Sequence, residues 1–208
     1  MKILRLERNF EQFIIKELQK NKIFVIATDT SYGIIGKISP EVIQRIFKIK
    51  KRLKEKSIPI FVNKKIVQEL AVPNEKARIL MKKFWPGDLT IILKAKPEKV
   101  SFLRPVLGPD NTIAIREPDN KLILDVLRKI KEPLTATSAN ISAKPPAYKS
   151  KEVLDYFSIK PSPDYFIDFG NLPKKPVSTI IDLTDDLKIL RTGEIKEKEI
   201  KEVLKVNN

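Results

Sequence analysis

The chain has 208 residues, of which 42% are hydrophobic, and its 41 Lys and Arg against 26 Asp and Glu give a formal net charge of +15. It contains neither cysteine nor histidine. These absences exclude disulfides, thiolate chemistry, and triads or metal sites built on either residue. Any catalysis must therefore use carboxylates, lysines, hydroxyls, backbone dipoles or a carboxylate-held metal.

The positive charge has two interpretations. It suits an anionic partner such as a nucleic acid, a nucleotide or phosphate. It also suits the lysine-rich and glutamate-rich surface of a heat-adapted protein. The N-terminal stretch MKILRLERNFEQF has no long apolar core and no cleavage site, and every apolar run is too short to span a bilayer. We therefore expect a cytoplasmic protein without a membrane partner.

Helix and strand patterns alternate along the whole chain. The clearest helix start is at Ser39, whose hydroxyl can cap a helix that has Pro40 at its first position. A turn containing Gly33 and Gly36 is expected after the first strand pattern. The predicted helices cover 9–20, 40 to about 50, 74–85, 119–130, 150–157 and 196–205. The predicted strands cover 22–28, 57–62, 89–95, 112–116, 165–169, 178–183 and 188–191. The pattern has no repeat and no linker, and predicts one α/β domain over residues 1–208 with a twisted, mixed sheet and flanking helices.

The segment 133–143 differs from the rest of the chain because it carries no charge. It instead offers short hydrogen-bonding side chains between apolar ones, at Thr135, Thr137, Ser138, Asn140 and Ser142. Hydroxyls and an amide can hold the polar atoms of a ligand, while cations elsewhere neutralise its phosphates. The segment is therefore a candidate binding site.

Three polar pairs are spaced two residues apart where an apolar element ends. They are Thr28 with Thr30, Lys50 with Arg52, and Ser138 with Asn140. In an extended segment both members of such a pair share one face, and ligands of open α/β sheets bind beyond strand ends. The alternatives are a simple strand end, a solvated helix face, and a turn whose side chains bond their own backbone. The spacing leaves these alternatives open.

Cations near the pairs favour an anionic ligand. Lys50 and Arg52 can face one ligand only if their helix has unwound by about residue 51. Arg116 and Arg191 each follow an apolar strand, and arginine is suited to two-pronged capture of a carboxylate or phosphate. The sequence contains no Walker A motif and no GxGxxG. Electrostatic positioning of anions is the chemistry that this residue set favours.

Seven stretches, in order, resemble the YrdC-like family of threonylcarbamoyl-AMP synthases, in its short single-domain form. They are TDTSYGIIG (28–36), IFKIKKR with SIPIFV (46–62), FWPGDLTIIL (84–93), TIAIREPD (112–119), PLTATSANISAKPP (133–146), STIIDLT (178–184) and ILRTGEI (189–195). The resemblance covers about residues 10–195. It implies a YrdC-like α/β fold with a large, positively charged concave cavity.

The resemblance also implies a function. Members of the family are nucleotidyltransferases that join L-threonine, bicarbonate and ATP, with Mg²⁺ on the phosphates, into threonylcarbamoyl-AMP and pyrophosphate. A downstream threonylcarbamoyl-transferase complex then modifies an adenosine of tRNA to N6-threonylcarbamoyladenosine, which makes tRNA a further expected partner.

The family's site residues fall on named positions of this chain. Its Lys-x-Arg and Ser-x-Asn signature falls on Lys50, Arg52, Ser138 and Asn140. By the same matching, the expected threonine contacts are Thr30, Arg116, Ser178 and the backbone near Ala136. The expected nucleotide contacts are Arg52, Lys56, Thr112, Ser138 and Arg191.

Several positions depart from the family pattern, and two other functions stay open. Asp88 replaces the second proline of a typical PGPLT, Phe61 stands where some members carry histidine near threonine, and Ala143 replaces a glycine, so that a positive φ is not expected there. One alternative function is a double-stranded RNA or tRNA-binding module, whose affinity would fall steeply with salt. The other is an adenylating paralogue that acts on a different substrate.

Overall fold

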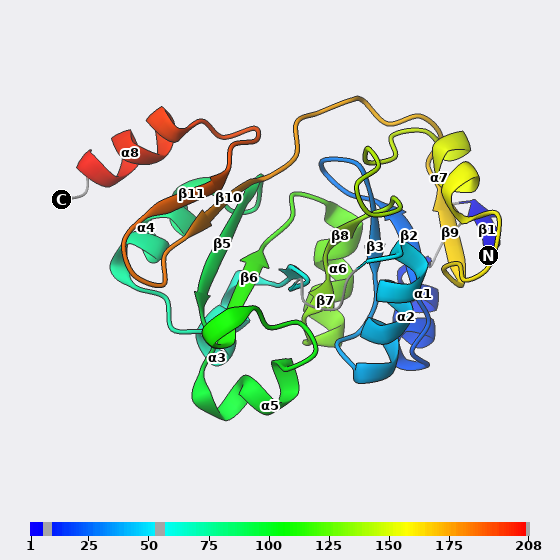
Figure 1. Cartoon of the computed structure of the whole chain (residues 1–208), viewed down its shortest axis with the longest axis horizontal. Helices are drawn as coiled ribbons and strands as arrows, with labels where there is room; N and C mark the ends of the chain where they lie inside the picture. Colours follow the sequence, from blue (N-terminus) through cyan, green and yellow to red (C-terminus); the bar gives the residue numbers. More distant parts are fainter. Residues whose placement is uncertain (6–9, 53–56, 207–208) are drawn as a thin grey trace.

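The computed structural model of the chain describes residues 1–5, 10–52 and 57–206 (Figure 1). The strands form two mixed sheets rather than the single sheet expected from the sequence. The first sheet has the order β1 (Lys2–Arg5), β9 (Tyr165–Asp168), β2 (Phe24–Ala27), β3 (Tyr32–Ile35) and β8 (Thr137–Ser138). The second has the order β11 (Lys188–Arg191), β10 (Thr179–Asp182), β5 (Leu89–Lys94), β6 (Thr112–Arg116), β4 (Ile60–Phe61) and β7 (Leu134–Thr135).

Helices flank both sheets, which confirms the expected α/β class with mixed strands. The helices α1 (Phe10–Gln19), α2 (Pro40–Lys50) and α7 (Ser150–Phe157) lie beside the first sheet in Figure 1. The helices α3 (Val67–Leu70), α4 (Glu75–Phe84), α5 (Val100–Leu103) and α8 (Glu197–Val206) lie beside the second, and α6 (Lys121–Ile130) lies between the two groups. Short 3₁₀ turns cover Lys64–Ile66, Pro97–Lys99 and Pro109–Asn111. No helix of the described residues is long and apolar enough to cross a membrane.

Local signals explain why the helices begin where they do. The Ser39 side chain accepts a hydrogen bond from the amide of Val42, with Pro40 in the first turn, as the sequence predicts. Asn74 caps α4 and Asn120 caps α6 in the same way. Asn9, the first residue of the helix predicted over 9–20, lies outside the described residues.

The charge-free segment joins the two sheets. Leu134 and Thr135 pair with β4 of the second sheet, and Thr137 and Ser138 pair with β3 of the first. Between them, the amide of Ala136 donates to the carbonyl of Pro59 (2.8 Å). The segment 133–143 is therefore short of charge partly because it runs through the junction of the sheets, where unpaired charges would be poorly solvated.

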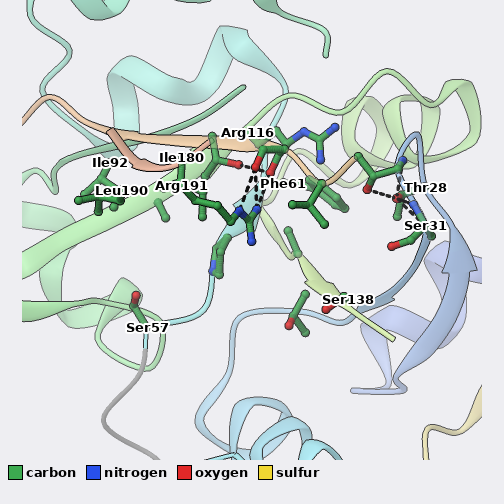
Figure 2. Close-up of a pocket in the computed structure, with 18 of the residues that line it drawn as sticks. Thr28, Ser31, Ser57, Phe61, Ile92, Arg116, Ser138, Ile180, Leu190 and Arg191 are labelled. Carbon is green, nitrogen blue, oxygen red and sulfur yellow. Dashed lines mark hydrogen bonds between the residues drawn. The ribbon is translucent and has the colours of Figure 1, made fainter. Parts of the chain in front are cut away.

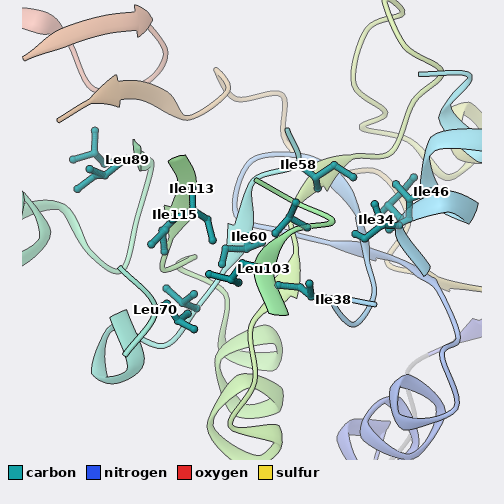
Figure 3. Packing of buried hydrophobic residues seen from close by; sticks show 14 of the residues in the cluster. Ile34, Ile38, Ile46, Ile58, Ile60, Leu70, Leu89, Leu103, Ile113 and Ile115 are labelled. Atoms are coloured by element: carbon teal, nitrogen blue, oxygen red, sulfur yellow. The ribbon is translucent and has the colours of Figure 1, made fainter. Parts of the chain in front are cut away.

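One apolar cluster continues from the first sheet into the second (Figure 3). It includes Val25 and Ile34 of the first sheet and Ile91 and Ile115 of the second, all fully buried. A second cluster lies where α1 and α6 cover the first sheet. One domain over residues 1–208 stays a prediction, which this shared core favours.

Two predicted elements differ from the structure. The expected turn at Gly33 is the strand β3, whose four residues are buried. The glycine serves close packing there, because a Cβ would lie 2.7 Å from Cγ2 of Thr28. The strand predicted over 57–62 contains only Ile60 and Phe61. The elements β1, β7, β8, α3 and α5 were not predicted.

Candidate active site

A cavity of about 330 Å³ opens between the two sheets (Figure 2). In Figure 2, Arg116, Arg191 and Phe61 lie between the apolar residues Ile92 and Leu190 on one side and Thr28 and Ser31 on the other. Its described lining contains three arginines and no carboxylate. The lining residues are Thr28, Thr30, Ser31, Arg52, Ser57, Pro59, Phe61, Thr90, Ile92, Ala114, Arg116, Ala136, Thr137, Ser138, Val177, Ser178, Ile180, Leu190 and Arg191.

A second opening of about 350 Å³ adjoins the first and shares Arg52 and Ser138 with it. Its lining adds Lys50 and Asn140. The four residues on which the Lys-x-Arg and Ser-x-Asn signature falls therefore meet at one place, although about 90 residues separate the two pairs. We call these four residues the Lys50 end of the cavity.

Lys50 is held almost entirely by the protein. Its Nζ donates to the carbonyl of Ser138 (2.5 Å), the carbonyl of Asn140 (3.0 Å) and Oδ1 of Asn140 (2.8 Å). Burial, followed by the nearby charge of Arg52, lowers the pKa of Lys50 to about 7. The three acceptors match the three N–H groups of an ammonium and oppose that shift. Lys50 thus fixes the Ser138–Asn140 segment.

The helix carrying Lys50 ends where the sequence requires it. Lys51 takes a left-handed conformation, with φ 49° and ψ 44°, and its amide and that of Arg52 bond back to the last turn. This turn confirms the expected unwinding at residue 51 and directs Arg52 into the cavity. Arg52 donates from Nη2 to the carbonyl of Ser57 (2.7 Å). Its Nε is buried and has no partner among the described residues.

The other two polar pairs are not extended, so that part of the prediction was wrong. Oγ1 of Thr28 accepts from the amides of Thr30 (3.2 Å) and Ser31 (3.3 Å), which makes a turn. The amide of Asn140 bonds to the carbonyl of Ser138 (3.0 Å), and Oγ of Ser138 donates to Oδ1 of Asn140 (2.8 Å). Both pairs reach the cavity through turns, which place side chains on one side as effectively as a strand.

Ala143 also differs from the expectation. Its φ is +67°, in the left-handed region, whereas the sequence predicts no positive φ for an alanine at this position. The loop is tied on either side, because Nδ2 of Asn140 donates to the carbonyl of Lys144 and the amide of Ser142 donates to the carbonyl of Lys50 (2.8 Å). These bonds hold alanine in a conformation that it disfavours by about 1 kcal/mol.

Arg116 lies at the end of β6 and is enclosed by protein acceptors. Its Nε donates to the carbonyl of Gly87 (2.7 Å), and its Nη2 donates to Oδ2 of Asp29 (2.7 Å) and to Oδ1 of Asp88. Arg116 lines the cavity, whereas Asp29 and Asp88 are not among its lining residues, and we call the three together the Arg116 end of the cavity. The Nε–Nη2 edge and the Nη1–Nη2 edge of the guanidinium therefore each have a protein acceptor. A substrate carboxylate can bond to two nitrogens of Arg116 at once only if Asp29 or Asp88 moves away.

Arg191 and Ser178 form a third group between the sheets. Arg191 donates from Nε (3.0 Å) and Nη2 (2.8 Å) to the carbonyl of Ser178, and from Nη2 to its Oγ (3.0 Å). The same Oγ lies 3.0 Å from Oγ1 of Thr90. Burial, followed by the charge of Arg116, lowers the pKa of Arg191. Ser178 is thus oriented by Arg191 and Thr90 at the cavity wall.

The structure brings together most of the predicted site residues. Thr30, Arg116, Ala136 and Ser178 line the cavity as expected for a common site, and so do Arg52, Ser138 and Arg191. Thr112 begins β6 beside Gly108 and is not among the lining residues. Lys56 lies outside the described residues.

Sequence reasoning did not identify Thr90, Asp29 or Asp88 as site residues. Thr90 and Ile92 both line the cavity, and their spacing on β5 is the period of two that marks one face of a strand. No comparable local signal connects Asp29 or Asp88 with Arg116. No group of three or more acidic residues that could hold a metal occurs in the part of the chain that the structure describes.

The sequence matches the Sua5/YciO/YrdC family, whose description is "telomere recombination", over residues 16–193. A Methanocaldococcus jannaschii relative is 36% identical over 177 residues, which are 84% of this chain and 81% of the relative. The threonylcarbamoyl-AMP synthase of Bacillus subtilis is 32% identical over 191 residues, or 90% of this chain. The chain spans about half the length of that relative (54%).

Solved structures agree with the sequence match. The crystal structure of Pyrococcus abyssi Sua5 complexed with L-threonine has a TM-score of 0.86 and 27% identity, covering 98% of this chain and 60% of that one. Escherichia coli YciO has a TM-score of 0.82 at 24% identity and covers 96% of this chain and 98% of its own, which supports the fold. The chain therefore belongs to the Sua5/YciO/YrdC family.

Proposed function

We propose that the protein is a nucleotidyltransferase that makes threonylcarbamoyl-AMP and pyrophosphate from L-threonine, bicarbonate and ATP. The observation that carries this proposal is the convergence of Lys50, Arg52, Ser138 and Asn140 on a cavity with three arginines and no carboxylate in its described lining. Relatives bearing the synthase name and a relative complexed with L-threonine support the choice of substrates.

The reaction needs anions to be brought together. The threonine amine takes up bicarbonate to give a carbamate and water. A carbamate oxygen then attacks the α-phosphorus of ATP, a new P–O bond forms, the bond to the β-phosphate oxygen breaks, and pyrophosphate leaves. Arg52 and Arg191 can offset the charge that gathers on the phosphates. The chemistry requires no covalent enzyme intermediate, so the lack of cysteine and histidine is no obstacle.

The two ends of the cavity suit different parts of the substrates. Arg52, which lines the cavity and has no carboxylate partner among the described residues, suits the phosphates of ATP. Arg116, Thr30 and Ser178 suit L-threonine. Mg²⁺ would enter as MgATP, because the described lining offers hydroxyls but no carboxylate for a resident ion.

Pyrophosphate release tests the proposal. The protein is supplied with MgATP, L-threonine and bicarbonate, and each is omitted in turn. Release that requires all three supports the proposed reaction. Release with another amino acid in place of threonine would favour the adenylating paralogue, and no release would overturn the proposal.

The proposal implies that the product, threonylcarbamoyl-AMP, is used soon after it forms. Threonylcarbamoyl-AMP is a mixed anhydride that water hydrolyses, so we propose that a threonylcarbamoyl-transferase consumes it and that tRNA is the final acceptor. A coupled assay with such a transferase and unmodified tRNA would detect the modified adenosine, and its absence despite pyrophosphate release would refute this step.

A further inference from the structure

The Arg116 end of the cavity contains more negative than positive charge. One guanidinium and two carboxylates leave a net charge of −1 at a position that the proposed function gives to the carboxylate of L-threonine. An incoming carboxylate would meet repulsion there unless one of the two aspartates withdrew. The arrangement therefore needs an explanation beyond simple capture by arginine.

The two aspartates are not equivalent. The Asp29 side chain is 7% exposed, and its Oδ2 also accepts from the amide of Asp119 (2.7 Å), which anchors it. The Asp88 side chain is 19% exposed, and among the described residues Arg116 is its one side-chain partner. Asp88 is therefore the carboxylate that can withdraw, and Asp29 is the fixed one.

Arg116 keeps donors for a ligand. Of its five N–H groups, Nε and Nη2 supply the three that are engaged. No acceptor of the described residues bonds to Nη1, and Arg116 lines the cavity. While Asp88 stays in place, a ligand carboxylate can reach Nη1 only end-on. When Asp88 withdraws, the edge between Nη1 and Nη2 becomes free for a two-pronged pair.

We propose that Asp88 is a specificity-determining residue that competes with the carboxylate of the amino-acid substrate for Arg116. The inference rests on the proposed function for the identity of that substrate. The competition weakens binding of every ligand that carries a carboxylate at this position. It also makes amino-acid affinity depend on the ionisation of one aspartate.

The surroundings of Asp88 favour an adjustable charge. Burial, together with the charges of Asp29 and Glu194, raises the pKa of Asp88, while the charges of Arg116 and Lys175 lower it, and burial has the largest effect. The net direction is upward. L-Threonine affinity should therefore rise as the pH falls toward this raised pKa, because protonated Asp88 no longer competes as an anion.

The test compares Asp88→Asn with the unchanged protein and with Glu194→Gln. Asparagine keeps an oxygen for Nη2 but removes the charge. Glutamine at residue 194 removes a nearby exposed carboxylate that has no bond to Arg116. Binding of L-threonine and of L-threoninol, which lacks the carboxylate, is measured by calorimetry, and KM and kcat are measured by pyrophosphate release.

We expect Asp88→Asn to bind L-threonine about tenfold more tightly, which corresponds to about 1.4 kcal/mol. L-Threoninol should show no gain, and pyrophosphate release should show the gain as a lower KM for L-threonine. The increase of threonine affinity at lower pH should be lost in Asp88→Asn and kept in Glu194→Gln.

Each contrary result has a distinct meaning. If pyrophosphate release does not need L-threonine in the unchanged protein, the proposed function fails and the inference fails with it. If release needs L-threonine but Asp88→Asn leaves its affinity unchanged, the inference alone is overturned. The same holds if L-threoninol gains affinity equally, or if the variant binds L-threonine more weakly and melts at a lower temperature, which would mark Asp88 as a structural ion-pair partner.

Discussion

The two ends of the cavity differ in whether their cationic side chains are paired with carboxylates. At the Arg116 end, the guanidinium has two carboxylate partners, Asp29 and Asp88. At the Lys50 end, neither Lys50 nor Arg52 has a carboxylate partner among the described residues, and both bond to neutral oxygens. Cations paired with carboxylates suit a site that discriminates between ligands, whereas cations without carboxylate partners suit a site that binds phosphates.

The largest expected effect is at Arg52. Arg52→Gln should lower pyrophosphate release about 100-fold or more, because a donor aimed at developing phosphate charge is lost. The fold should persist, since among the described residues the Arg52 side chain has one hydrogen bond, to the carbonyl of Ser57. Lys48→Gln is the matched control, because it removes an exposed charge outside the cavity, from the last turn of α2 four residues before Arg52. Equal activity in both variants would contradict the contrast between the two ends.

Close backbone packing beside Ser178 should give the next largest effect. A Cβ on Gly193 would lie 1.9 Å from the carbonyl oxygen of Val177 and 2.7 Å from the carbonyl carbon of Ser178. Gly193→Ala should therefore lower the free energy of unfolding by about 3 kcal/mol and move Ser178 away from Arg191. Urea denaturation measures the loss.

Gly170→Ala is the control for Gly193→Ala. Gly170 also has no side chain, but a Cβ there meets no atom within 4 Å, and only its φ of +74° opposes alanine. A loss of about 1 kcal/mol is expected. If both alanine variants lost equal stability, the contact with Val177 would not be the cause.

The buried ammonium of Lys50 predicts a dependence of stability on pH. A lysine whose pKa falls from 10.5 to about 7 on folding lowers the free energy of unfolding below pH 7, where the buried group must be charged. The unfolded chain holds more protons between the two values, so stability rises with pH through that window. Lys50→Met removes this dependence and three hydrogen bonds, for a loss of about 2 kcal/mol.

Denaturation curves at about pH 6 and about pH 9 test the Lys50 prediction. The unchanged protein should gain stability relative to Lys50→Met at the higher pH. A constant difference between the two proteins would mean that the three acceptors keep Lys50 charged throughout, and that its pKa stays near the ordinary value.

The smallest effect is expected at Ala143, beside the Lys50 end. Ala143→Gly should raise the free energy of unfolding by about 0.5 kcal/mol, because glycine accepts a φ of +67° without strain. Lys131→Gly, at a φ of 55° after α6 and outside the cavity lining, should gain a similar amount. Thermal unfolding compares them, and a loss at residue 143 alone would show that the Ala143 methyl group stabilises the loop.

Local sequence signals determined most of the elements and half of the site. Strand β6 and helix α7 have the predicted bounds, because alternation and helical periodicity are local properties that survive in the fold. The end of α2 at Lys51 followed from the requirement that Lys50 and Arg52 face one ligand. Family motifs then named the residues that the cavity brings together.

Only the tertiary structure decided how the sheets divide and what surrounds Arg116. Leu134 and Ser138 are four residues apart, yet they pair with different sheets, because pairing depends on which strand edges are free nearby. Asp29 and Asp88 lie 87 and 28 residues from Arg116 in the sequence, and no periodic pattern connects them. The sequence by itself determined which side chains could carry charge to the site. The packing of the strands determined which of those charges are neutralised.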